Sequence, residues 1–169
     1  IGGPQCTQPY DASRLNISGM SFGALSSTAI TALNKGAAMG GFAHNTGEGS
    51  ISEYHLSHGA DIIWQLGTGY FGCRTSTGRL DDQVFAEKAR QDVVKMIEIK
   101  ISQGAKPSHG GVLPGAKVTA EIARIRTVEV GKTVESPASH PEFGTPREFT
   151  DFIQRLRSLS GGKPIGFKM

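Results

Sequence analysis

The sequence predicts an α/β fold, a (β/α)8 TIM-type barrel of which these 169 residues supply about the first five strands. Apolar runs of strand length alternate with segments of helical periodicity, which is typical of a parallel sheet. Each expected strand leads into a loop rich in glycine or polar residues, and glycine, with 23 residues, is about twice as frequent as its usual share of roughly 7%. Polar residues at the strand ends favour a barrel, whose sites lie there. An open doubly wound sheet is the competing architecture.

The expected elements follow one another along the chain. Strands are expected over residues 14–20, 42–46, 61–66, 94–102 and 165–169, and helices over residues 27–38, 82–92, 117–126 and 145–159. Ser26 or Ser27 is the expected N-cap of the first helix, and Gly40-Gly41 ends it. Strong alternation of apolar and polar residues makes residues 94–102 the clearest strand.

The helix over residues 145–159 carries the strongest start signal. Thr145 is its expected N-cap, Pro146 takes the first helical position and Glu148 completes a capping box. Its expected buried face is made by apolar residues at helical spacing: Phe149, Phe152, Ile153 and Leu156.

The chain divides into a lead-in segment, residues 1–13, and a partial barrel domain, residues 14–169. It begins without an initiator Met, and its last expected strand stops at Met169 with no return segment. We therefore expect the domain to continue beyond the last residue in a longer chain, or the chain to form an oligomer.

Charge and cysteine usage exclude several classes of protein. Eighteen basic and fifteen acidic residues give +3 without any block of like charge, which argues against nucleic-acid binding. No apolar run approaches the roughly 18 residues of a membrane span, and no signal peptide is recognisable. Cys6 and Cys73 cannot form a disulfide framework, so a cytoplasmic protein is expected.

Three short motifs fail when their context is considered. Gly67–Gly72 matches the dinucleotide pattern G-x-G-x-x-G, but no helix opens after it. Gly131-Lys132-Thr133 lacks the first P-loop glycine, since Arg126 stands there. His55 and His58 are interpreted as surface histidines, and no metal site is expected.

Two residues remain candidates on chemical grounds alone. His109, in a glycine-rich loop, is a candidate for lining a site. Lys168, at a strand end, is a candidate Schiff-base nucleophile or fixed cation beside a cofactor, and the alternative is a solvent-exposed lysine at a cut terminus.

Several motifs, in one order, resemble the FMN-binding domain of the glutamate synthase family, and most closely its stand-alone glutamate synthase-like proteins. Met20–Ser26 resembles MSFGAMS, Asn45–Gly49 resembles NTGEGG without its last residue, and Gly69-x-Phe71-Gly72 resembles GRFGV. The resemblance continues through Lys100–Pro107 (KVAQGAKP), Gly110–Pro114 (GGQLP), Lys117–Arg126 and Ser136-Pro137, and so covers residues 17–169.

The resemblance implies an FMN-dependent oxidoreductase that reduces the imine of 2-oxoglutarate and ammonia, or of a related oxo acid and amine, to an amino acid. By the same resemblance Glu48, Lys100 and Gln103 surround the oxo acid as catalytic residues. The residues that it places along FMN are Met20, Ser21, Asn45, Gln65, Thr68 and Lys168. A cation such as Lys168 near the reduced flavin suits electrostatic preorganisation.

The chain also departs from the family pattern. Tyr70 replaces the arginine of G-R-F-G, so the carboxylate clamp is in question, with Arg74 as a candidate substitute. Ser108-His109 replaces Gly-Glu. The family's iron–sulfur cysteines would lie beyond Met169, and Cys6 and Cys73 do not supply that set. An electron donor, ferredoxin or a reductase subunit, is a further expected partner.

Two other functions remain open at this point. One is a Schiff-base lyase or aldolase that uses Lys168 or Lys100. The other is a non-catalytic barrel segment that completes its sheet with a partner chain through its open edge.

Overall fold

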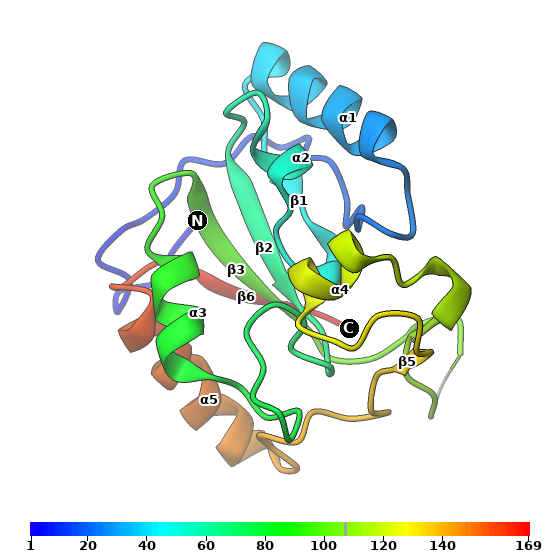
Figure 1. Cartoon of the computed structure of the whole chain (residues 1–169). Helices are drawn as coiled ribbons and strands as arrows, with labels where there is room; N and C mark the ends of the chain where they lie inside the picture. Colours follow the sequence, from blue (N-terminus) through cyan, green and yellow to red (C-terminus); the bar gives the residue numbers. More distant parts are fainter. Residues whose placement is uncertain (107) are drawn as a thin grey trace.

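Residues 1–106 and 108–169 are described by a computed structural model, in which they form an α/β fold around one parallel sheet (Figure 1). In this part of the chain the sheet has four strands in the order β1-β2-β3-β6, all parallel. They are β1 (His44–Asn45), β2 (Ile62–Leu66), β3 (Val94–Lys100) and β6 (Ile165–Lys168). The α/β class and the parallel pairing are confirmed. The sheet is open among the described residues, an arrangement compatible with part of a barrel.

The strand expected over residues 14–20 is wrong as a regular element. Ile17 makes only an isolated parallel bridge to His44, although Met20 N also donates to the Asn45 carbonyl. The Asn16 side chain accepts from Ala43 N at 2.9 Å, where a ladder would use a main-chain carbonyl. The segment therefore lies along β1 without forming a full strand.

Helices connect the strands, and their starts follow from capping side chains. They are α1 (Ser27–Gly40), α2 (Glu53–Leu56), α3 (Asp82–Ala89), α4 (Ala120–Arg126) and α5 (Pro146–Leu159), with 3-10 turns at Gly47–Gly49 and Gly115–Lys117. The N-cap Ser26 accepts from Ala29 N, and the Thr145–Glu148 capping box of α5 is confirmed. Thr119 caps α4, so this helix begins three residues later than expected.

The sequence did not predict two short features. One is the single turn of α2; the other is a small antiparallel pair, β4 (Val112–Leu113) with β5 (Val134–Glu135). Both lie in connections after sheet strands, and β4 with β5 belongs to the long segment between β3 and α5. Pro107 of the glycine-rich loop lies outside the described residues.

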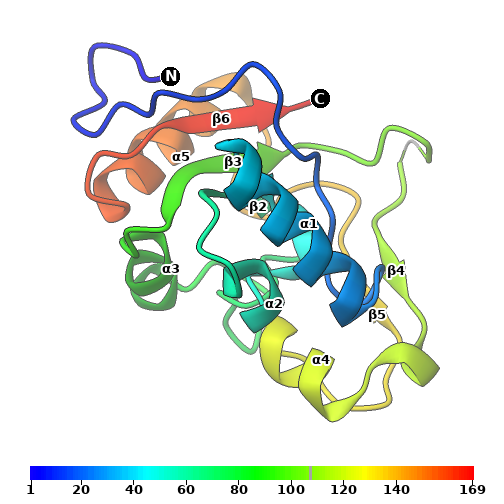
Figure 2. The same ribbon diagram turned by 90° about the horizontal axis from the view of Figure 1, so that it is seen from above.

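The main core lies between the sheet and two helices, α3 and α5, which Figure 2 shows on the same side of the sheet. Trp64 of β2 stacks on Phe85 of α3 at 5.2 Å, and Phe152 and Leu156 of α5 are buried in the same cluster, which confirms the expected face of α5. Alternation along the strands sends Gln65 and Glu98, which pair in register, to the opposite face. That face carries the polar groups described below.

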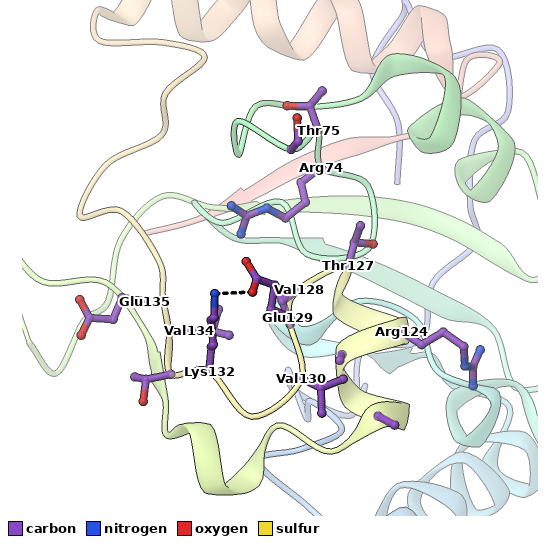
Figure 3. Close-up of a pocket in the computed structure, with 14 residues that line it drawn as sticks. Arg74, Thr75, Arg124, Thr127, Val128, Glu129, Val130, Lys132, Val134 and Glu135 are labelled. Atoms are coloured by element: carbon purple, nitrogen blue, oxygen red, sulfur yellow. Dashed lines mark ion pairs between the residues drawn. The ribbon is translucent and has the colours of Figure 1, made fainter.

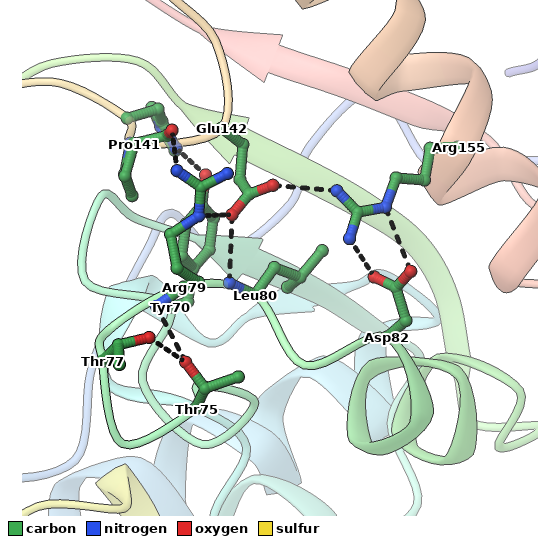
Figure 4. A network of polar contacts seen from close by, with 10 residues as sticks. Tyr70, Thr75, Thr77, Arg79, Leu80, Asp82, Pro141, Glu142 and Arg155 are labelled. Carbon is green, nitrogen blue, oxygen red and sulfur yellow. Dashed lines mark hydrogen bonds and ion pairs between the residues drawn. The ribbon is translucent and has the colours of Figure 1, made fainter.

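An ion network joins the loop after β2 to α3 and α5 (Figure 4). The Glu142 carboxylate, whose side chain is 5% exposed, accepts from Arg79 Nε at 2.8 Å and from Arg155 NH1 at 2.8 Å. Arg155 NH2 also donates to Asp82 Oδ1 at 2.6 Å. The loop that precedes α5 is thereby tied to the start of α3.

The first residues of the chain contact its last turn. Thr7 N and Gln8 N both donate to the Gly162 carbonyl, at 3.0 and 3.1 Å, and Cys6 Sγ lies 3.1 Å from the same oxygen. Across residues 1–106 and 108–169, no helix has the length and apolar character that crossing a membrane requires.

Candidate functional site

Glu48, Lys100 and Gln103 form one hydrogen-bonded cluster at the carboxyl end of the sheet. Lys100 Nζ donates to Glu48 Oε1 at 3.1 Å and to Gln103 Oε1 at 2.8 Å. Gln103 Nε2 donates to Glu48 Oε1 at 2.7 Å and Oε2 at 3.0 Å. Each of the three side chains therefore contacts both of the others, and the Lys100 and Glu48 side chains are only 16% and 20% exposed.

The ends of two strands bring this cluster together. Glu48 lies in the 3-10 turn that follows β1, and Lys100 ends β3. The loop after β2 must approach Glu48 closely, because a Cβ on Gly67 would lie 2.4 Å from Glu48 Oε2. Glycine at this position therefore leaves room for the Glu48 side chain where it contacts Lys100.

Arg126 completes the charged group, and sequence reasoning missed it. The residue is only 6% exposed, its NH2 donates to the Phe22 carbonyl at 2.9 Å, and its Nε is a buried donor without a partner among the described residues. Burial lowers the pKa of this guanidinium, and the nearby Glu48 carboxylate opposes the shift. The available signal was its place as the last residue of Lys117–Arg126, one of the segments that resemble the family pattern.

A small cavity of about 120 Å³ lies beside these groups. Its lining includes Ser21, Glu48, Arg126 and Ser136, together with Phe71. The Arg126 guanidinium carbon lies 5.3 Å from the Phe71 ring centre, a cation–π contact. The cavity therefore combines a cation, a carboxylate and hydroxyl groups, a set that suits a small polar anion.

Asn45 and Gln65 also come together, through a carboxylate that the sequence analysis did not single out. Glu98 Oε1 accepts from Asn45 Nδ2 at 2.8 Å and from Gln65 Nε2 at 2.6 Å. Because an ionised carboxylate only accepts, it fixes both amides with their nitrogens toward Glu98. The Asn45 oxygen is taken by Gly47 N at 3.0 Å, whereas no described residue donates to the Gln65 oxygen.

The remaining predicted cofactor residues lie around this group with different roles. Ser21 lines the small cavity, and the Met20 carbonyl lies 2.9 Å from His55 Nε2. Thr68 is buried and donates its hydroxyl to the Pro137 carbonyl at 2.6 Å. Lys168 pairs in register with Lys100 but is exposed at the end of β6, and among the described residues no hydrogen bond or ion pair joins it to the cluster.

Tyr70, where the family pattern has arginine, does not line the cavity. It is fully buried with its hydroxyl 2.8 Å from His140 Nδ1. Arg74 lies with its guanidinium carbon 5.6 Å from the Phe71 ring centre. Arg126, rather than either of these, is the cation that lines the cavity.

The histidines differ from the sequence expectation. His58 is exposed, but His55 is fully buried, so its interpretation as a surface residue is wrong. Its Nδ1 accepts from Ser52 N, at 3.2 Å, and it caps α2. His109 is exposed, and its amide donates to the Lys106 carbonyl at 3.2 Å.

His44 is the most isolated of these rings. It is fully buried on the helix-facing side of β1, its ring centre lies 5.1 Å from that of His55, and neither ring nitrogen has a partner among the described residues. Burial, with a smaller contribution from His55, lowers the pKa of His44 from 6.5 to about 4.

The described residues contain no group of three or more side chains arranged to hold a metal ion. Cys73 is fully buried, and burial raises the pKa of its thiol to about 12. Cys6 lies elsewhere, with its thiol next to the Gly162 carbonyl. These two thiols do not fit an iron–sulfur cluster, which takes several thiolates at one place.

A separate groove of about 910 Å³ lies away from this cluster (Figure 3). It lies along α4 and β5, with Arg74, Arg124 and the ion pair of Lys132 with Glu129 on its walls. Arg74, the candidate substitute for the carboxylate clamp, lines it, whereas the predicted catalytic and cofactor residues do not.

Comparison with known proteins places the chain in a family. A family model described as the conserved region in glutamate synthase matches residues 7–169. The chain is 47% identical over its whole length to a glutamate synthase large subunit-like protein, YerD, of Bacillus subtilis, and covers 32% of that protein.

More distant relatives are also named as glutamate synthases. The chain is 34% identical over 89% of its length to the archaeal-type glutamate synthase [NADPH] of Thermotoga maritima, and 33% identical over 90% to the archaeal glutamate synthase [NADPH] of Archaeoglobus fulgidus, covering 27% of each. It thus spans about a third or less of the proteins that it matches. With the match over residues 7–169, the chain belongs to the glutamate synthase family.

Proposed function

We propose that this chain forms the flavin and oxo-acid site of an FMN-dependent oxidoreductase of the glutamate synthase type. The reaction would reduce the imine of 2-oxoglutarate and ammonia to glutamate. Family membership supports the class of enzyme. The observation that carries the assignment of the site is the cluster of Glu48, Lys100 and Gln103 beside Arg126.

The cluster has the chemistry that an oxo acid requires. Arg126, which lines the cavity, supplies positive charge for a carboxylate, and the Lys100 ammonium, bonded to the lining residue Glu48, adds a second cation close by. Gln103 adds an amide donor next to them, suited to a carbonyl oxygen. At about 120 Å³ the cavity equals roughly four water molecules in liquid, which suits a small acid.

Glu48 supplies the opposite charge. Reduction of an imine adds a hydride to carbon and a proton to nitrogen, so the site must hold an ammonia-derived N–H group and a proton beside it. The Glu48 carboxylate accepts such N–H groups, as it does those of Lys100 and Gln103 here. Lys100 and Glu48 together hold the proton that the imine nitrogen takes up.

The polar face of the sheet suits a flavin ring in one respect. Glu98 turns the Gln65 amide so that its oxygen is an acceptor without a donor among the described residues, and a flavin ring offers an N–H group to such an acceptor. Gln65, Ser21 and Lys168 would hold the cofactor, while Asn45, Thr68 and Met20 support that surface through internal bonds. When bound, FMN supplies the hydride.

The test uses the full-length protein. We expect flavin absorption bands, and glutamate formation from 2-oxoglutarate and ammonia with chemically reduced flavin. Arg126→Met should raise the KM for 2-oxoglutarate about 10-fold or more, because hydrogen bonds to charged groups are worth about 1.5–3 kcal/mol. Arg124→Met is the matched control, since Arg124 lies on the same helix but is exposed, paired with Glu53.

A colourless protein that takes up no FMN would contradict the flavin assignment. Equal effects of Arg126→Met and Arg124→Met would contradict the assignment of the cavity. Covalent trapping of 2-oxoglutarate on Lys100 or Lys168 by borohydride would instead favour Schiff-base chemistry.

A further inference from the structure

We propose that Tyr70 and His140 form a positioning pair that fixes the main chain of β3 at Lys100 and thereby the geometry of the Glu48–Lys100–Gln103 cluster. The inference rests on the proposed function, because it assigns these two buried residues to the binding of the oxo acid. Neither side chain lines the small cavity, so both would act through Lys100.

His140 makes two hydrogen bonds, one to the Lys100 carbonyl and one to the Tyr70 hydroxyl, and the carbonyl determines which atom donates in each. His140 Nε2 lies 2.8 Å from the Lys100 carbonyl oxygen, which only accepts, so Nε2 carries the proton. His140 is 4% exposed, and burial lowers its pKa, so the ring is neutral and Nδ1 accepts. The Tyr70 hydroxyl, 2.8 Å away, is therefore the donor. The chain of bonds runs from Tyr70 through His140 to Lys100.

The accepting carbonyl lies where β3 leaves the sheet. The pairing of β2 with β3 ends at Leu66 with Ile99, one residue before Lys100. This carbonyl lies past the last pair of β2 with β3, although Lys100 still pairs with Lys168 of β6, and His140 donates to it. The same residue carries the ammonium that binds Glu48, and Gln103 follows three residues later. A shift of the main chain here would move two members of the cluster.

The segment that carries His140 is itself held on three sides. Its ring stacks on Phe143 at 4.7 Å and 19°. Upstream, Thr68 donates to the Pro137 carbonyl at 2.6 Å, and Ser136 N donates to the Gly111 carbonyl at 2.9 Å. These contacts hold the imidazole in place independently of its hydrogen bond to Lys100, as a positioning residue requires.

Tyr70 is fixed in a comparable way. It is fully buried, its backbone takes φ 44°, and its ring lies 6.2 Å from that of Phe152 in α5. A non-glycine residue in the left-handed region costs conformational energy that the surrounding contacts must offset. Phenylalanine at this position would keep the packing and lose only the hydroxyl.

The experiment compares four variants of the full-length protein: Tyr70→Phe, His140→Gln, His140→Leu and Phe143→Leu. Glutamine can place an amide N–H near the position of His140 Nε2, so His140→Gln keeps the donor to Lys100, whereas His140→Leu removes it. Phe143→Leu removes apolar packing from the same ring without touching a hydrogen bond. It is the matched control for a purely structural role.

We expect His140→Leu to raise the KM for 2-oxoglutarate about 3- to 10-fold, the range that one lost hydrogen bond gives. Tyr70→Phe should raise the same KM about 3-fold, and the KM of His140→Gln should lie within about 2-fold of the wild-type value. Phe143→Leu should lower the thermal midpoint as His140→Leu does and leave KM within about 2-fold. Equal KM effects of His140→Leu and Phe143→Leu, or no rescue by glutamine, would overturn the proposal.

A second readout needs no activity. Hydrogen exchange in FMN-free protein should be faster at the Ile101 amide, which donates to the Lys168 carbonyl, in His140→Leu and unchanged in His140→Gln. If the wild-type protein makes no glutamate, the proposed function fails, and this comparison still decides whether the pair fixes the strand end. Equal exchange in all four variants would refute the positioning role.

Discussion

Replacing His44 tests whether a buried, unpaired imidazole resists protonation and makes the fold sensitive to acid. The folded state holds this ring with its pKa lowered from 6.5 to about 4, whereas in the unfolded chain it titrates near 6.5. Because the pKa of His44 is lower in the folded state, this ring does not affect stability above pH 6.5. Stability is lost as the pH falls from 6.5 toward 4. The pKa changes by about 2.5 units, which at 1.36 kcal/mol per unit limits the loss of stability to about 3 kcal/mol. By pH 5 the loss is about 2 kcal/mol.

His44→Leu removes that proton site and also two buried ring nitrogens without partners. Because such groups are costly to bury, the variant should be as stable as wild type or more stable at pH 8. Between pH 8 and pH 5 it should lose about 2 kcal/mol less than wild type. Urea unfolding, followed by the fluorescence of Trp64, the single and buried tryptophan, measures both quantities. His58→Leu, at an exposed site, serves as the control.

If wild type and His44→Leu lose the same free energy between pH 8 and pH 5, His44 does not exclude protons from the folded state. The reasoning from its burial would then be refuted.

Three further predictions concern the site and the ion network. Glu48→Gln should lower kcat/KM for 2-oxoglutarate about 10-fold or more, measured by steady-state kinetics, whereas Glu53→Gln, which removes an exposed ion pair, should not. Gly67→Ala should displace the Glu48 carboxylate and reduce activity by a similar factor, and a crystal structure with Glu48 unmoved would contradict this. Glu142→Gln should lower the free energy of unfolding by about 1–2 kcal/mol in urea titrations, since one nearly buried carboxylate serves two partly exposed arginines; no change would show that the network contributes nothing.

Much of the fold could be predicted from local signals. The strands at Ile62–Leu66 and Val94–Lys100 and the helix at Pro146–Leu159 each have strong periodicity or a cap, and their placement is confirmed within two residues. The two-residue strands β4 and β5 have no periodicity to detect, because their pairing depends on contacts far along the chain.

The site was predictable only in part, for a related reason. Alternation along β3 already placed Glu98 and Lys100 on one face, so Glu98 was within reach of sequence reasoning. The approach of Arg126 to Glu48 depends instead on how α4 folds back over the loop after β1, which no local pattern shows. The burial of Tyr70 was equally hidden, because G-x-G-x-x-G describes backbone needs and not the direction of the side chain between them.

The strand order of the sheet also has a consequence for biosynthesis. β6 pairs with β3, in the register Ile97 with Ile165, across a connection that holds the β4–β5 pair, α4 and α5. On the ribosome, β3 and the Glu48–Lys100 pair emerge well before their outer neighbour, so an unpaired strand edge persists while about 65 residues are translated, for roughly 3–13 s at 5–20 residues per second. Such an edge recruits other strands. During this interval the nascent chain benefits from a chaperone, and truncations that end before Ile165 should aggregate more than a chain that includes β6.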